Sequence, residues 1–290
     1  MKYSNFAIVL SFFGLWLDSF ISNNTQVIVG FALILTFGIL HGANDLLLIK
    51  KIGSNKKPLP LLKLLLYYLI VVGFGALLFW IVPWFALLLF IVVSGYHFGE
   101  QQFQNIEKSI IFKTFEFTYG LFILMLLFIF HIKEVQEVIR NITSIKVSES
   151  YFLVGLVITT LILVILGFYF SQKLIEFKKK WILETFYLVV FTIIFKVSSL
   201  IWGFAIYFIL WHSIPSIINQ VIYLNGEFNW KNFGIYIKTA FAYWLISLIG
   251  IAVLYLLFKD VTIFNALFFS FLAAITFPHV LVIYILSKKK

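Results

Sequence analysis

Apolar segments that recur along nearly the whole chain are the feature that most constrains this sequence. Each has about the 20 residues that a helix needs to cross the hydrocarbon core of a bilayer. Of the 290 residues, 62% are hydrophobic and only 12% are charged, and the mean hydropathy is +1.05. A soluble globular domain could not bury so much apolar surface. The sequence therefore predicts an integral membrane protein of the all-α class, built as a polytopic transmembrane helix bundle.

About ten transmembrane helices are expected, within a range of eight to ten, in one integral-membrane domain over residues 1–290. The segment 181–195 is the weakest of them, because it is short and carries Glu184. Residues 132–150 are expected to form a polar loop, and Lys178, Lys179 and Lys180 to lie in a basic loop. The expected helices are 6–21, 27–49, 61–81, one that begins at 84, 110–131, 151–170, 181–195, 198–224, 234–258 and 261–286.

The distribution of basic residues predicts the orientation of these helices. The net charge of +10 is spread over short inter-helix loops and the C-terminus, which is the positive-inside pattern and not a nucleic-acid-binding surface. If the N-terminus is cytoplasmic, all but five of the 22 basic residues fall on the inner side. Both termini are therefore predicted to be cytoplasmic. The exceptions are Lys133, Arg140, Lys146, Lys196 and Lys259.

The absence of cysteine limits the chemistry of any cofactor. A chain with no cysteine forms no disulfide, no cysteine-ligated iron–sulfur cluster and no thiolate-ligated haem. Any metal must therefore be held by His, Asp or Glu.

Four histidines fall at a similar depth in this layout. His41, His97, His212 and His279 lie on helices that all run from outside to inside. At about 1.5 Å per residue, His41 and His279 lie roughly 12 Å from the cytoplasmic ends of their helices, and His212 roughly 18 Å. His97 lies at the same level if its helix continues past Glu100 towards Lys108. Four imidazoles at one level could converge on one ion, nearer the cytoplasmic side, whereas His131 stands at the outer end of its helix.

Polar neighbours accompany each of the four histidines. Asp45 follows His41 by four residues and Glu100 follows His97 by three, a spacing at which a carboxylate can fix the tautomer of a metal-binding imidazole. Ser213 and Ser216 follow His212, and Thr276 and Pro278 precede His279. Ionisable groups within a membrane are functional by default, but spacing alone leaves a shared metal site and a proton or solute pathway both open.

The histidine motifs together resemble the Brp/Blh family of membrane-bound β-carotene dioxygenases. The blocks are His41-Gly42-Ala43-Asn44-Asp45, Tyr96-His97-Phe98-Gly99-Glu100, Trp211-His212-Ser213 and Pro278-His279, in the order of that family. The resemblance implies a multi-pass enzyme of the inner (plasma) membrane that uses non-haem Fe(II) and O2. Its reaction would cleave β-carotene at the central 15,15' double bond into two molecules of retinal, which commonly pass to a microbial rhodopsin.

The same resemblance implies the ligands of the iron. The family's presumed histidine ligands correspond to His41, His97 and His212. Another histidine often follows the third by four residues, but here that position is Ser216. His279 is the natural substitute for this ligand.

The aromatic residues beside the motifs are candidates for a substrate tunnel, because β-carotene is soluble in the membrane. These residues are Tyr96, Phe98, Trp211 and Phe277, and for each of them ordinary helix packing is an equally good interpretation. Two other functions remain open from the residues alone. A b-type haem protein also uses transmembrane histidines, and a proton-coupled transporter could use the buried His, Asp and Glu residues.

Overall fold

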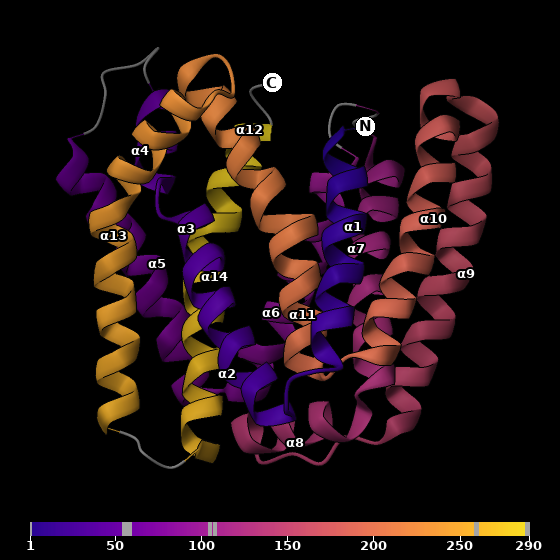
Figure 1. Ribbon diagram of the computed structural model, residues 1–290, viewed down its shortest axis with the longest axis horizontal. Helices are drawn as coiled ribbons and strands as arrows, with labels where there is room; N and C mark the ends of the chain where they lie inside the picture. Colours follow the sequence, from indigo (N-terminus) through magenta and orange to yellow (C-terminus); the bar gives the residue numbers. More distant parts are fainter. Residues whose placement is uncertain (1, 54–59, 104–105, 107–108, 258–260, 288–290) are drawn as a thin grey trace. The chain divides into compact units, whose positions relative to one another are not determined.

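The computed structural model describes residues 2–53, 60–103, 106, 109–257 and 261–287, and within them it contains helices and no β-strand, as predicted. Two π-helical segments, η1 (Ile34–Gly38) and η3 (Phe208–Ser213), interrupt the α-helices. The α-helices are α1 (Lys2–Asp18), α2 (Asn23–Leu33), α3 (Ile39–Gly42), α4 (Asp45–Ile52), α5 (Leu61–Ile81), α6 (Pro83–Gln102), α7 (Ile110–Phe130), α8 (Ile132–Thr143), α9 (Glu149–Lys173), α10 (Ile175–Val197), α11 (Leu200–Tyr207), α12 (Ile214–Asn225), α13 (Trp230–Leu257) and α14 (Val261–Ser287) (Figure 1).

Eight helical stretches of the described residues are long and apolar enough to cross a membrane, which lies within the expected range. Two of them are composite: Asn23–Ile52 comprises α2, η1, α3 and α4, and Leu200–Asn225 comprises α11, η3 and α12. The remaining two expected spans correspond to α1, which has 17 residues, and α10, which begins with a charged turn. The prediction of an all-α polytopic bundle is confirmed.

Two expected loops are wrong in whole or in part, since only residues 144–148 of the loop expected at 132–150 lie outside a helix. Residues 132–143 form α8, whose apolar residues, such as Val135 and Ile139, recur at helical spacing between charged ones; such an amphipathic segment is a stable helix when one face is covered. The basic run Lys178–Lys180 lies inside α10, because this helix begins at Ile175 after one extended residue, Leu174. Lysine is a good helix former, so a run of lysines does not by itself break a helix.

Several residues used to predict the orientation lie outside the described residues, as does Phe258 at one expected helix end. The cytoplasmic location of both termini and the single-domain organisation remain predictions. The basic residues concerned are Lys56, Lys57, Lys108, Lys259, Lys288, Lys289 and Lys290.

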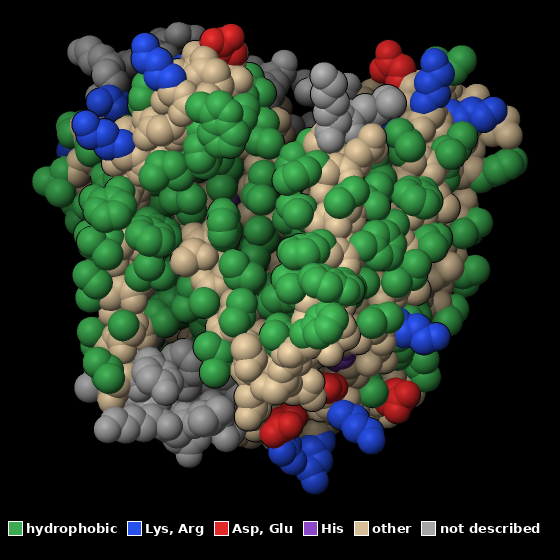
Figure 2. Space-filling view, viewed as in Figure 1, with side chains coloured by type: hydrophobic (Ala, Val, Ile, Leu, Met, Phe, Trp, Pro, Cys, Tyr) green, Lys and Arg blue, Asp and Glu red, His purple; other side chains and the backbone are tan. Residues whose placement is uncertain are grey.

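Large apolar side chains are exposed along the helices. On α9, for example, Ile165 is 64% and Phe168 68% exposed. Figure 2 shows hydrophobic side chains covering the helices on one face, with Lys, Arg, Asp and Glu mostly at the helix ends. Water would solvate such apolar surface poorly, whereas lipid would cover it, so the surface supports a membrane-embedded chain.

The chain divides into two compact units, which are described separately. The first unit comprises Met1–Phe31, Ile91–Glu137 and Lys146–His212. In it, α7 packs against α9 and α10, and α1 packs against α10 and α11 (Figure 1). Its core is a cluster of aromatic rings with centroids about 5–6 Å apart, mostly edge to face, which is the preferred geometry for aromatic pairs. The cluster consists of Phe103, Phe112, Phe115, Phe170, Phe177 and Trp181.

The second unit comprises Ala32–Phe90, Val138–Ile145 and Ser213–Lys290. In it, α14 packs against α4, α5 and α13, and α13 also packs against α3 and α12. Leu48 and Ile52 of α4 meet Val282, Ile283 and Leu286 of α14 in a buried apolar cluster. This contact holds the segment that follows His41 against the segment that follows His279.

Glycines allow the C-terminal half of α6, which carries His97, to approach α7 within the first unit. A Cβ atom at Gly99 would overlap the backbone carbonyl of Glu116, and one at Gly120 would overlap the carbonyl of Gly95. We expect Gly120→Ala to lower the free energy of unfolding by about 3 kcal/mol, because rigid backbone cannot yield to the extra methyl group. Thermal unfolding in detergent would measure the change. The control is Gly73→Ala, where a Cβ would meet nothing within 4 Å; equal melting temperatures for the two variants would contradict the prediction.

Candidate metal centre

His41 lies between two irregularities of its helix. The π-helical segment η1 precedes it, and the helix opens after Gly42, so that α4 starts anew at Asp45. The residue at the opening, Asn44, has φ −97° and ψ 11°, in the bridge region of backbone space. π-Helical segments are frequent at functional sites, where they re-aim side chains. The helix opening therefore sets the direction of both His41 and Asp45.

Side chains of α12 and α13 hold this opening in place. Asn44 donates from Nδ2 to the carbonyl of Tyr236 over 3.0 Å and accepts at Oδ1 from Thr239 over 3.0 Å. The carbonyl oxygen of His41 accepts from Gln220 Nε2 at 2.8 Å, and the hydroxyl of Tyr236 donates to Gln220 Oε1 at 2.9 Å. Buried backbone groups need such partners, so these bonds fix the backbone that presents His41.

Asp45 joins two other side chains inside the second unit. It is 1% exposed, and its two oxygens lie 2.9 and 3.1 Å from Nδ1 of His279. The hydroxyl of Tyr68, on α5, donates to Asp45 Oδ2 at 3.1 Å. Because a carboxylate only accepts hydrogen bonds, the His279 tautomer that fits carries its proton on Nδ1. That tautomer leaves Nε2 as the metal-binding atom.

The rings of His41 and His279 form a pair. Their centroids are 4.6 Å apart and their planes meet at 85°. His41 is 6% exposed and His279 is 3% exposed. The structure thus brings together three of the predicted site residues, His41, Asp45 and His279, within one unit.

The first unit contains a second histidine pair. His97 on α6 and His212 in η3 have ring centroids 4.7 Å apart at 77°, and they are 3% and 2% exposed. Phe98 lies against His212 with centroids 4.7 Å apart. The amide of Gln101 donates to the carbonyl oxygen of His212 at 2.8 Å. This bond gives the carbonyl at the end of the irregular segment η3 a side-chain partner from α6.

The remaining predicted residues are mostly buried in helix contacts. Glu100 and Ser213 are 7% and 0% exposed. Ser216 accepts a hydrogen bond from Gln220 Nε2 at 3.1 Å, so it belongs to the network behind His41. His131 is buried between α7 and α8, and its role outside the site remains a prediction.

The four tunnel candidates differ in their surroundings. Trp211 donates from Nε1 to Ser11 Oγ at 2.9 Å, so its ring is anchored to α1. Phe277 is 9% exposed and touches the position of Gly75, where a Cβ would be 2.9 Å from its ring. Tyr96 is half-buried, and Phe98 contacts His212 as described. Whether any of them lines a tunnel remains a prediction.

Sequence reasoning missed the residues that support the histidines. Tyr68, Gln101, Gln220 and Tyr236 lie far from the motifs that they contact in the same unit. A glutamine inside an apolar helix such as α12 was a usable signal, because a buried amide requires partners. Tyr68 gave no signal of this kind, since tyrosine is common in membrane helices.

The donor set fits a divalent transition metal. Among the described residues, the ring nitrogens of His41 and His279 are placed so that they could hold a metal ion. Neutral imidazole nitrogens suit iron, zinc and copper alike. In the tautomer fixed by Asp45, Nε2 is the atom of His279 that can bind an ion, and the chain has no cysteine to compete for it.

We expect Tyr68→Phe to weaken metal binding about ten-fold, the lower end of the effect of removing a partner of a metal-site ligand. The phenol positions the Asp45 carboxylate, and phenylalanine keeps the ring but loses the hydrogen bond. Competition with a chelator would measure the affinity. The control is Tyr67→Phe, the neighbouring and 58% exposed tyrosine; unchanged affinity in Tyr68→Phe would show that Asp45 does not need this donor.

Comparison with known protein families identifies the family of this chain. The family model of β-carotene 15,15'-dioxygenase matches residues 32–287, which include all four histidine motifs. Comparisons with curated proteins and with solved structures found no significant match. The resemblance inferred from the motifs is therefore confirmed over most of the chain, and the chain belongs to the β-carotene 15,15'-dioxygenase family.

Proposed function

We propose that this chain is a non-haem iron dioxygenase that cleaves β-carotene at its central 15,15' double bond to give two molecules of all-trans-retinal. In this reaction the C=C bond breaks, and each of its two carbons receives one oxygen atom of O2. The observation that carries the proposal is the burial of two imidazole pairs in apolar helices, one of them oriented by a carboxylate.

The proposed ligands of Fe(II) are His41, His97, His212 and His279. The pairing inside each unit and the common depth predicted from the sequence support this set. These four imidazoles would hold the ion, which when bound would supply the activation of O2. Asp45 holds the proton at Nδ1 of His279, and Tyr68 holds Asp45. The apolar helices around the histidines exclude water, which protects reactive oxygen species from side reactions.

The surroundings of the site suit a substrate dissolved in the bilayer. β-Carotene has no charged group, so we propose that it enters from the lipid side and reaches the histidines past aromatic side chains such as Phe98. The proposed location is the inner membrane, with the iron nearer the cytoplasmic side. Retinal leaving the site would be available to a microbial rhodopsin.

The experiment that tests the function is chromatography of retinal in a β-carotene-accumulating host that expresses this chain. We expect retinal to appear as β-carotene falls, relative to an empty vector. The absence of retinal from well-expressed protein supplied with iron and oxygen would contradict the proposal. A haem absorption band in that purified protein would favour the b-type haem alternative, and proton-coupled uptake in vesicles would favour the transporter.

A further inference from the structure

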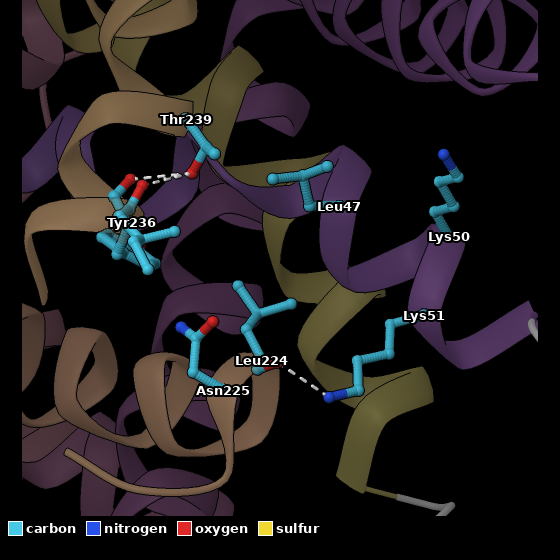
Figure 3. A pocket seen from close by; sticks show the side chains of 8 residues that line it. Leu47, Lys50, Lys51, Leu224, Asn225, Tyr236 and Thr239 are labelled. Carbon is cyan, nitrogen blue, oxygen red and sulfur yellow. Dashed lines mark hydrogen bonds between the residues drawn. The ribbon is translucent and has the colours of Figure 1, made fainter. Parts of the chain in front are cut away.

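A pocket of about 470 Å³ lies in the second unit where the ends of α4 and α12 meet α13. Figure 3 shows the side chains of α4 on one side of it and those of α12 and α13 on the other. No residue that lines it is acidic. The lining consists of Leu47, Lys50, Lys51, Leu224, Asn225, Ile235, Tyr236 and Thr239.

Lys51 is fixed at the pocket without a carboxylate. Its Nζ donates to the backbone carbonyls of Tyr223 and Leu224 at 2.7 and 2.9 Å, and it lies 5.3 Å from the centre of the Tyr223 ring. These carbonyls belong to the last turn of α12, where helical partners are missing. Because an ammonium group has three donors, one N–H of Lys51 remains for a ligand.

Lys50 adds a second positive charge. Its side chain is exposed, and within the described part of the chain it forms no hydrogen bond or ion pair. The amide of Asn225 adds a neutral polar group on the side of the pocket opposite the two lysines, whereas the hydroxyl of Thr239 already donates to Asn44 (Figure 3). A pocket with two positive charges, a neutral amide and no acid favours an anion.

The rest of the lining is apolar. Leu47, Leu224 and Ile235 form this part, and Ile235 is 44% exposed on the outer face of α13. A free inorganic anion would gain nothing from these side chains, whereas an amphiphile with an anionic head and a hydrocarbon chain would satisfy both parts. Basic pockets between membrane helices on the cytoplasmic side are a recognised form of lipid head-group site.

We propose that this pocket binds the phosphate head group of an anionic phospholipid, with an acyl chain lying along Ile235 and Leu47. The inference does not rest on the dioxygenase reaction. It does connect with the histidine site, because Tyr236 and Thr239 line the pocket and also bond to Asn44 at the helix opening. A bound lipid therefore stabilises the backbone beside His41.

The test is native mass spectrometry of the purified full chain with phosphatidylglycerol or phosphatidylcholine. We expect one phosphatidylglycerol to be retained in preference to phosphatidylcholine. Lys50→Gln should weaken its retention about five-fold, the factor that corresponds to ~1 kcal/mol per basic residue. The matched control is Lys63→Gln, an exposed lysine of the same unit outside the pocket. Lys50 is preferred to Lys51, whose replacement would also remove two hydrogen bonds to α12.

A second variant distinguishes binding of the lipid in the pocket from its general electrostatic attraction to the protein surface. Leu47→Trp fills the pocket without changing its charge and should also release the lipid. Equal losses in Lys50→Gln and Lys63→Gln, or full retention in Leu47→Trp, would overturn the proposal. Displacement of phosphatidylglycerol by millimolar inorganic phosphate would also overturn it, in favour of a small-anion site. A rise in melting temperature with phosphatidylglycerol that is absent in Leu47→Trp would support it.

Discussion

His41→Ala is expected to abolish retinal formation and to remove most of the bound iron. The imidazole of His41 is buried against that of His279 at 4.6 Å, and no other described side chain of α3 can replace it as a ligand. Removing a partner of a ligand costs roughly 10- to 100-fold in metal affinity or activity, so removing the ligand itself should cost more than about 100-fold. His97→Ala and His212→Ala should behave alike, because these two rings form the other pair.

Iron per purified protein and retinal per unit of protein are the two measurements for this series. His131→Ala is the control, since His131 is also buried but stands between α7 and α8. It should keep both iron and activity. Melting temperature and gel filtration separate loss of the metal from loss of the fold. An active, fully metallated His41→Ala protein would refute the proposed ligand set.

His279→Ala is expected to lose iron, whereas Ser216→Ala is expected to keep it. His279 contacts Asp45 at 2.9 Å through Nδ1, so Nε2 is the atom that would bind an ion. Ser216 instead accepts a hydrogen bond from Gln220, and replacing its hydroxyl removes only one bond of the network behind His41. The difference in bound iron should again exceed about 100-fold.

Asp45→Asn extends this comparison to the carboxylate. The variant keeps the size of the side chain but loses the charge that holds the proton on His279, so we expect metal affinity to fall roughly 10- to 100-fold without disappearing. Loss of iron from Ser216→Ala together with full retention in His279→Ala would exclude His279 as the fourth ligand. Complete loss of iron from Asp45→Asn would indicate that Asp45 is itself a ligand.

The sequence predicted the helical class and the functional motifs because both depend on local chemistry. An apolar segment of bilayer length must satisfy its backbone hydrogen bonds internally, so it forms a helix wherever it is placed. Polar and ionisable residues inside such segments stand out against the apolar background, which made His41, Asp45, His97, His212 and His279 recognisable without coordinates. The spacing of four between His41 and Asp45 predicted that this carboxylate would orient His41, but Asp45 contacts His279 instead.

Predictions of helix ends from the local sequence were wrong where these ends depend on more than hydropathy. The lysines at 178–180 were read as a loop because charge is costly inside a membrane, but helix α10 begins before them. The segment 132–143 was read as a loop because it is polar, although its apolar residues recur at helical spacing in α8. In both segments a correct estimate of hydropathy led to a wrong secondary structure.

By itself, the sequence determined the all-helical class of this chain and the family to which its motifs belong, and it predicted a site built from histidine and carboxylate side chains. Only the tertiary structure decided that Asp45 binds His279, 234 positions away, and not His41 on its own helix. It also decided that Tyr68, Gln220 and Tyr236 support these groups. The physical reason is that the opening of the helix at Asn44 turns Asp45 toward α5 and α14, and hydrophobic periodicity carries no information about which distant side chains meet there.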